Sequence, residues 1–145
     1  MKLGIRRADH LGDMILTTPL ARTMARDGWD VTVVGPAAHS AVWENNPLAT
    51  YQAIEDVCPD WPRGKIRLGR WLSCRGFTHL LVPYYSTPLF VASLFSGIAH
   101  RYCQMGRFKG RLTLHHCLRS RILSEPRHMG AVWQDLAEHL GIPAG

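Results

Sequence analysis

The sequence predicts a single α/β domain whose mostly parallel sheet carries helices on both faces. Two observations lead to this prediction. Short apolar runs, typical of strands, alternate along the chain with segments whose apolar residues recur at helical spacing. The strand candidates are continuously apolar, as is usual when both faces of a sheet are buried. The chain has 145 residues, 46% of them hydrophobic, so we expect residues 1–145 to bury one core and form one domain.

The first half of the chain alternates three strand candidates with two helix candidates. In order, they are a strand at 2–7, a loop at 8–12, a helix at 13–26, a strand at 31–34, a short helix at 37–44 and a strand at 50–54. Asp27-Gly28 is typical of a helix end. Pro19 leaves two interpretations of the first helix: a kink, or a start at Thr18 as the cap with Pro19 as the first helical residue.

The second half continues the alternation. In order, the segments are a loop at 56–64, a basic amphipathic helix at 65–75, a strand at 78–82, a helix at 89–95, a strand at 100–104, a long loop with some helix at 106–121 and an amphipathic helix at 128–140. Gly76 and Gly141 follow two of these helices and are interpreted as their C-terminal glycines.

The charge of +6 is concentrated in the middle of the chain. Residues 63–128 carry twelve basic and one acidic side chain, and fourteen of all seventeen basic residues are arginines, which suit carboxylates and phosphates. The densest basic tract comprises Arg101, Arg107, Lys109, Arg111, Arg119 and Arg121. This pattern indicates an anionic partner, such as an acidic sugar, a phosphate or an anionic membrane surface, or else a solvated basic face. A nucleic acid is not expected, because no aromatic-basic motif of an RNA-binding module is present.

Several classes of protein are disfavoured by what the sequence lacks. The apolar stretch at 80–99 is interrupted by prolines and polar residues, and charge returns soon after the N-terminus, so we expect a cytoplasmic protein. The four cysteines form no CxxC pair and are interpreted as reduced thiols. Neither a dinucleotide fingerprint nor a phosphate-binding loop is present. No histidine cluster or Asp-x-Asp pair predicts a metal, and we expect no cofactor.

The loop after the first strand is the first place to look for chemistry, since ligands of such folds bind beyond the carboxyl ends of the strands. Gly12 permits a tight turn and close approach of a ligand. Asp13 would lie in the first helical turn, where the helix dipole favours its ionised form. It is therefore either a general base for a substrate hydroxyl or simply a cap of the helix.

Three further residues flank this loop. Arg6 and Arg7 could hold an acidic sugar through bidentate hydrogen bonds, although surface arginines are the simpler interpretation. His10 could assist proton transfer or donate a hydrogen bond to a sugar, or it could be a loop histidine without a role.

The string Leu-Gly-Asp-x-x-x-Thr-Thr-Pro-Leu, residues 11–20, resembles the opening of the family 9, heptosyltransferase-like glycosyltransferases. Three further segments are similar to that family. They are the run Val-Thr-Val-Val-Gly-Pro at 31–36, Asn46-Pro47 before the third strand, and the helix-to-strand segment 71–79. The segment 128–142 resembles the helix that closes the first domain of these enzymes.

This resemblance implies a GT-B fold, in which two Rossmann-like domains face a cleft. The first domain would bind the acceptor, a lipopolysaccharide precursor, and the second would bind the donor, ADP-heptose. The resemblance gives Asp13 the role of catalytic base. With the first domain as the acceptor domain, we predict Gly12, Arg6, Arg7, His10, Thr17 and Thr18 as its acceptor-binding residues.

No segment of the sequence resembles the second, donor-binding domain, so we expect this domain to be inactive by itself. A separate donor-binding chain could complete it, and the apolar face left without its partner could support a homodimer. The basic middle would suit a peripheral position at the inner membrane. The alternative function is a stand-alone, non-catalytic module that binds an anionic glycan, a lipid surface or a partner protein.

Overall fold

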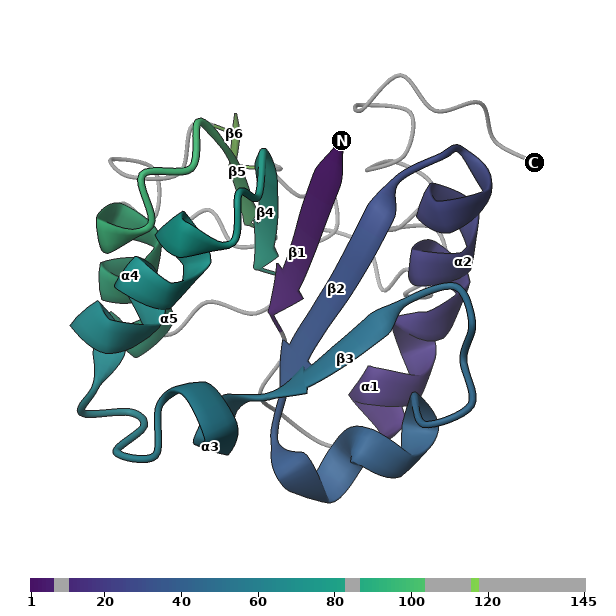
Figure 1. Ribbon diagram of the computed structural model, residues 1–145, viewed down its shortest axis with the longest axis horizontal. Helices are drawn as coiled ribbons and strands as arrows, with labels where there is room; N and C mark the ends of the chain where they lie inside the picture. Colours follow the sequence, from purple (N-terminus) through teal and green to yellow (C-terminus); the bar gives the residue numbers. More distant parts are fainter. Residues whose placement is uncertain (7–10, 83–86, 104–115, 118–145) are drawn as a thin grey trace, which may run out of the picture.

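The computed structural model describes residues 1–6, 11–82, 87–103 and 116–117, and in these parts of the chain six strands form one parallel sheet (Figure 1). The order across the sheet is β3-β2-β1-β4-β5-β6. The strands are β1 (Lys2–Arg6), β2 (Asp30–Gly35), β3 (Thr50–Ala53), β4 (His79–Val82), β5 (His100–Cys103) and β6 (His116–Cys117). The described helices are α1 (Leu11–Leu16), α2 (Thr18–Arg26), the 3₁₀ helix η1 (Ala37–Val42), α3 (Ile54–Val57), α4 (Lys65–Cys74) and α5 (Thr87–Phe95).

The central position of β1 determines where a ligand can reach the sheet. Gly4 of β1 is paired with Thr32 of β2 on one side and with Leu80 of β4 on the other. Along the chain, β2 pairs with one side of β1 and β3 follows beyond β2. The chain then crosses back, and β4 pairs with the other side of β1. The order of strands therefore reverses between β1 and β4, and such a reversal opens a crevice at the carboxyl ends of the two strands.

Two apolar cores take alternate residues of the strands. Val33 belongs to one core together with α2 residues such as Met24, whereas the next residue, Val34, belongs to the other core. The second core also contains Leu68 of α4 and Leu89 of α5. Successive residues of a strand point to opposite sides of a sheet, which accounts for this alternation. Figure 1 shows α2 on one side of the strands and α4 and α5 on the other.

The predicted helix at 13–26 is wrong in two respects: it begins at Leu11, inside the predicted loop at 8–12, and it consists of two helices that break at Thr17. Thr17 takes the cap position of α2, with Thr18 first and Pro19 second in the helix. Proline lacks an N–H group, and in the first turn of a helix that group would have no intrahelical partner. The interpretation with Thr18 as the cap and Pro19 as the first helical residue is therefore displaced by one residue. The cap of α2 is Thr17, and its first helical residue is Thr18.

Other boundaries differ where periodicity is weak. Ile54 begins α3 instead of ending a strand, and β6 lies inside the segment predicted as a long loop with some helix. Gly28 and Gly76 end α2 and α4 with φ of +83° and +71°, which confirms both predicted helix ends. The predicted helix at 128–140 lies outside the described residues.

Candidate functional site

The carboxyl edge of the sheet brings together the starts of three helices. β1 ends at Arg6, and α1 begins at Leu11, with Gly12 and Asp13 as its second and third residues. Figure 1 shows α1, η1 and α3 at the end of the sheet to which the strand arrows point. Gly12 is exposed, and apart from its chain neighbours and the backbone of its own helix nothing lies within 4 Å of the position that a Cβ would take. A ligand at this edge could therefore approach the backbone of Gly12 closely.

Two hydrogen bonds hold the neighbouring connection between β2 and η1. The hydroxyl of Tyr51 donates to the carbonyl of Pro36 at 2.6 Å, and the amide of Ala37 donates to Oε2 of Glu55 at 2.8 Å. Both bonds link the residues after β2 to β3 and α3. They fix the wall of the carboxyl edge on the β2 side, because the backbone at Pro36 and Ala37 is held from two directions.

The other predicted acceptor residues differ in burial, and two of them lie outside the described residues. Thr17 is fully buried, and the Thr18 hydroxyl donates to the Ile15 carbonyl at 2.8 Å. In this structure the two threonines form the break between α1 and α2, and their contact with an acceptor stays a prediction. Arg6 is the last residue of β1. Arg7 and His10 lie outside the described residues, as do residues 83–86, which follow β4.

Sequence reasoning missed an apolar surface on α1. Leu11 and Ile15 are 50% and 51% exposed, and Leu16 is also partly exposed, although all three are large apolar side chains. Leu11 and Ile15 are four residues apart and therefore share one face of the helix. The signal that could have found them is this spacing, because Leu11 was assigned to the loop at 8–12 and Ile15 was left out of the apolar pattern of the predicted helix. The surface borders Gly12 and suits an apolar part of a ligand or another polypeptide.

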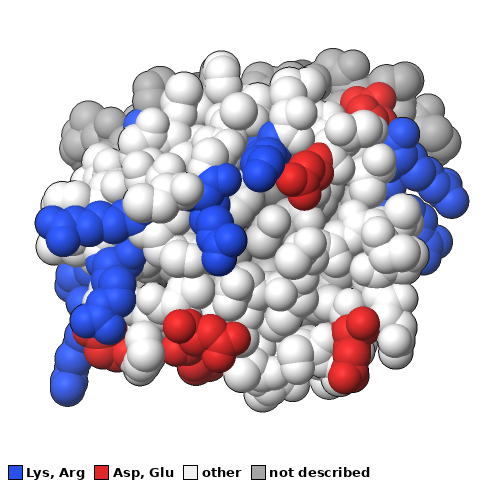
Figure 2. Space-filling view, in the orientation of Figure 1, with Lys and Arg blue, Asp and Glu red and all other residues white. Residues whose placement is uncertain are grey.

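Only one residue of the densest predicted basic tract is described. Arg101 is half-buried, and its guanidinium donates to the carbonyl of Ser93 at 3.1 Å. The other members of the tract lie outside the described residues. In Figure 2 several Lys and Arg side chains lie on the side of the molecule where Figure 1 places α4 and α5, and others lie near the centre and at the opposite edge.

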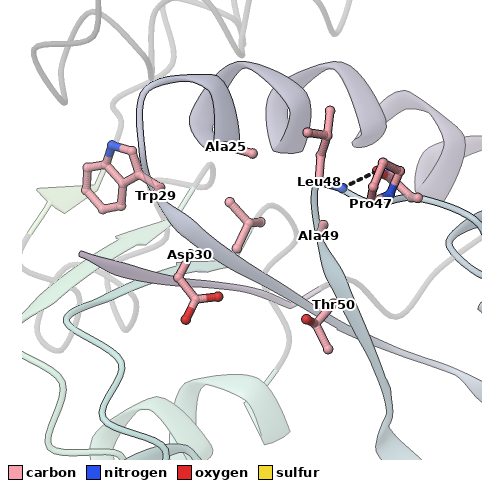
Figure 3. A pocket seen from close by; sticks show the side chains of 9 residues that line it. Ala25, Trp29, Asp30, Pro47, Leu48, Ala49 and Thr50 are labelled. Atoms are coloured by element: carbon pink, nitrogen blue, oxygen red, sulfur yellow. Dashed lines mark hydrogen bonds between the residues drawn. The ribbon is translucent and has the colours of Figure 1, made fainter.

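Two hollows among the described residues lie away from the predicted site. One, of about 400 Å³, lies where β2 and β3 begin; Trp29 and Asp30 line one side, and Leu48 and Thr50 line the other (Figure 3). Asn46 Oδ1 accepts a hydrogen bond from the Leu48 amide at 3.0 Å and shapes its rim. Since parallel strands start at the edge opposite their carboxyl ends, this hollow lies away from Gly12 and Asp13.

A second hollow, of about 470 Å³, is lined by His79 and His100 at the starts of β4 and β5. Their imidazole rings are stacked with centroids 4.6 Å apart, and the Trp29 ring meets His79 edge-on at 4.7 Å. Burial lowers the pKa of His79, with a smaller contribution from the neighbouring His100. Two stacked rings do not direct their nitrogen lone pairs at a common point. Among the described residues no group of three His, Cys, Asp or Glu side chains could hold a metal ion.

The parallel sheet, its strand order and the helix that follows the central strand define a Rossmann-like α/β fold. Comparison with solved structures supports this class. The chain superposes with a TM-score of 0.77 on a family 9 glycosyltransferase from Veillonella parvula, over 98% of this chain and 42% of that one, at 19% identity. It superposes with a TM-score of 0.65 on ADP-heptose lipopolysaccharide heptosyltransferase II of Escherichia coli, over 79% of this chain and 34% of that one, at 24% identity.

The resemblance to this family that the sequence predicts is thus confirmed at the level of the fold. The chain spans about two fifths and one third of the lengths of these two glycosyltransferases. No protein-family model and no curated protein matches it. None of the described helices is both long and apolar enough to cross a bilayer.

Proposed function

We propose that this chain is the acceptor-binding domain of a heptosyltransferase-like glycosyltransferase with GT-B architecture and helices on both faces of its sheet. One observation carries the proposal. The structure superposes on a family 9 glycosyltransferase over nearly its whole length, and its Gly12-Asp13 pair begins the helix after the central strand. That position borders the crevice in which ligands of such folds bind.

In the proposed reaction Asp13 acts as the general base. Its carboxylate takes the proton of an acceptor hydroxyl, and the oxygen attacks the anomeric carbon of ADP-heptose. The new carbon–oxygen bond forms as the bond to the diphosphate breaks, and ADP leaves with the electron pair. Attack from the opposite face inverts the configuration at that carbon. The donor is held by a second domain, in the same polypeptide or in a separate chain.

Arg6 and Arg7 would supply positive charge for the carboxylates or phosphates of a lipopolysaccharide-type acceptor. His10 would contribute a hydrogen bond to a sugar hydroxyl. Gly12 would leave room for the sugar beside the helix, since no atom lies near the position of its missing Cβ. The chemistry needs no cofactor beyond the donor substrate.

The direct test is a calorimetric titration of this chain with a phosphorylated inner-core oligosaccharide, beside a titration with ADP-heptose. We expect heat from the acceptor and none from the nucleotide sugar. Gly12→Leu should abolish acceptor binding without unfolding the chain, and Ser73→Leu, at an exposed position of α4, serves as a control away from the site. Binding of ADP-heptose alone would mean that this chain is the donor domain and that the proposal is wrong.

A test of Asp13 as the general base measures turnover, so the assay must contain a donor-binding domain. With one supplied, we expect Asp13→Asn to keep acceptor binding and to lower turnover by about 10²–10⁴-fold, the usual contribution of a general base. Turnover close to that of the unmodified chain would remove Asp13 as the base.

A second function is favoured by the exposed apolar side chains of α1. Leu11 and Ile15 suit a stand-alone module that binds a glycan or a partner protein without catalysis. That function predicts acceptor binding but no transfer with any donor domain, and no effect of Asp13→Asn on the binding constant.

A further inference from the structure

The pair of helices α4 and α5 presents a surface that the proposed reaction does not use. The two helices cross at Gly69, where an added Cβ would lie 2.6 Å from the carbonyl oxygen of Ala92 and 2.6 Å from the Cβ of Phe95. Because the helices are in direct contact, their outer faces form one continuous surface. Leu68 and Leu72 of α4 are buried in the core beneath, which directs the remaining sides of this helix outward.

Apolar side chains occupy the seam of this surface. Ile66 is 41% exposed on α4, and Leu94 and Phe95 are 44% and 49% exposed on α5. Ile66 precedes Gly69 by three residues and therefore lies on the same side of α4 as the crossing point. Phe95 lies at the crossing point itself. These three side chains keep a large apolar area in water although a core lies directly beneath them.

Basic side chains lie on α4 and directly before and after it. They are Arg63 and Lys65 at the start of α4, Arg67 and Arg70 within it, and Arg75 directly after it. Neither α4 nor α5 contains an acidic residue. Asp60 forms an ion pair of 3.2 Å with Arg67, and the Arg75 guanidinium lies 5.1 Å from the centre of the Trp71 ring. Figure 2 shows several Lys and Arg side chains on the side of the molecule that carries α4 and α5, with acidic side chains at its lower edge.

We propose that this α4–α5 surface, made of Ile66, Leu94 and Phe95 with the five basic residues around them, docks on an anionic lipid bilayer. Long basic side chains reach the headgroups of acidic lipids, while leucine, isoleucine and phenylalanine between them enter the boundary with the acyl chains. A nucleic acid would satisfy the arginines but leave the apolar seam in water. A folded protein partner would have to cover five basic groups with carboxylates. The bilayer matches both parts at once and needs no lipid-linked sugar.

The test is sedimentation of the full chain with vesicles of phosphatidylcholine containing 30% phosphatidylglycerol, and with vesicles of phosphatidylcholine alone. We expect binding to the anionic vesicles only, and its loss at high salt. Arg63→Gln with Arg70→Gln should weaken partitioning about 25-fold, because each basic residue near such a surface contributes about a factor of five. Leu94→Ala with Phe95→Ala should weaken partitioning at least about fivefold. This variant keeps the Cβ of residue 95, which contacts Gly69.

Two matched variants make the outcome decisive. Arg22→Gln with Arg26→Gln removes the same charge from the exposed side of α2 and should change partitioning by less than about threefold. Arg107→Gln with Arg111→Gln removes two positive charges from the other basic tract of the sequence, as a second comparison. An equal loss in all three charge pairs, or a loss confined to Arg107 and Arg111, would overturn the proposal. The proposal would also be overturned if the chain did not bind the anionic vesicles, or if it bound the anionic and the phosphatidylcholine vesicles equally. The vesicles carry no glycan, so the result does not depend on the proposed glycosyltransferase function.

Discussion

The imidazole rings of His79 and His100 are stacked across neighbouring strands, 4.6 Å between centroids and within 13° of parallel. The two residues are direct partners in the register of β4 and β5, which places their side chains on the same side of the sheet. Tyr102 extends the stack at 6.1 Å from His79, and Trp29, the residue before β2, meets His79 edge-on. A positive charge on His79 would therefore lie against another histidine and two aromatic rings.

This arrangement predicts that stability decreases in acid. Burial, and then His100, lower the pKa of His79 below its ordinary value of 6.5. The unfolded chain therefore binds a proton at His79 more readily than the folded chain does. Stability is greatest above about pH 6.5 and falls as the pH drops below that value toward the lower folded-state pKa. Urea unfolding midpoints at pH 7.5 and 5.5 measure this loss.

The variant His79→Gln separates the stack from general acid effects. We expect its midpoint to change less between the two pH values than that of the unmodified chain. His39→Gln, on η1 and outside the stack, should retain the full change. If both variants respond to pH in the same way, His79 does not carry the dependence.

Gly69 is predicted to be indispensable to the packing of α4 on α5. Gly69→Ala places a methyl group 2.6 Å from a backbone oxygen of Ala92, so the helices must separate. We expect a loss of about 1–3 kcal/mol in the free energy of unfolding, as for other overpacked sites. Gly12→Ala is the matched control, because α1 leaves open space there, and it should change stability by less than about 1 kcal/mol. Equal effects in a urea titration would contradict the close contact.

The two cysteines described in full should differ sharply in reactivity. Cys58 is buried, and its thiol lies 3.2 Å from the carbonyl of Gly64, whereas Cys74 is exposed. Burial and the nearby Asp60 raise the pKa of the Cys58 thiol, which lowers the fraction of reactive thiolate. Brief treatment with iodoacetamide at pH 8 should modify Cys74 and spare Cys58 until urea unfolds the chain. Peptide mapping by mass spectrometry that finds Cys58 modified first would refute the buried position.

The hydroxyl of Tyr51 is predicted to stabilise the connection after β2. Tyr51→Phe removes its 2.6 Å hydrogen bond to the Pro36 carbonyl and should cost about 1 kcal/mol. The ring of Tyr51 remains stacked beside Trp43 at 6.5 Å, so the core keeps its volume. Unfolding in urea, followed by tryptophan fluorescence, measures the change. No loss of stability would mean that water replaces the bond without cost.

The strands and their order were predictable to different degrees. Short β-branched runs such as 31–34 identify buried strands, because such a run has no charged residue to place in water. β6 has only two residues, His116 and Cys117, and nothing in its composition separates it from the surrounding basic segment. Its pairing with β5 is a tertiary contact between residues far apart in sequence, and no local pattern encodes it.

The candidate site was predictable where a motif carries it. Gly12 and Asp13 were expected beyond the first strand, and the structure places them in the first turn of α1. The full burial of Thr17 and the exposure of Leu11 and Ile15 were not expected. Thr17 and Met24 mark the buried side of this segment, and helical spacing places Ile15 on the other side. Apolar character alone therefore did not show which residues of α1 meet water.

The sequence by itself determined the α/β class, the positions of most strands and the helix ends at Gly28 and Gly76, because apolar periodicity and positive-φ glycine act over a few residues. Only the tertiary structure decided that α4 and α5 meet at Gly69 and that His79 stacks on His100. These contacts join residues on separate elements, and their geometry follows from strand order and helix packing. Local preference cannot specify a distance between segments that the chain brings together only when it folds.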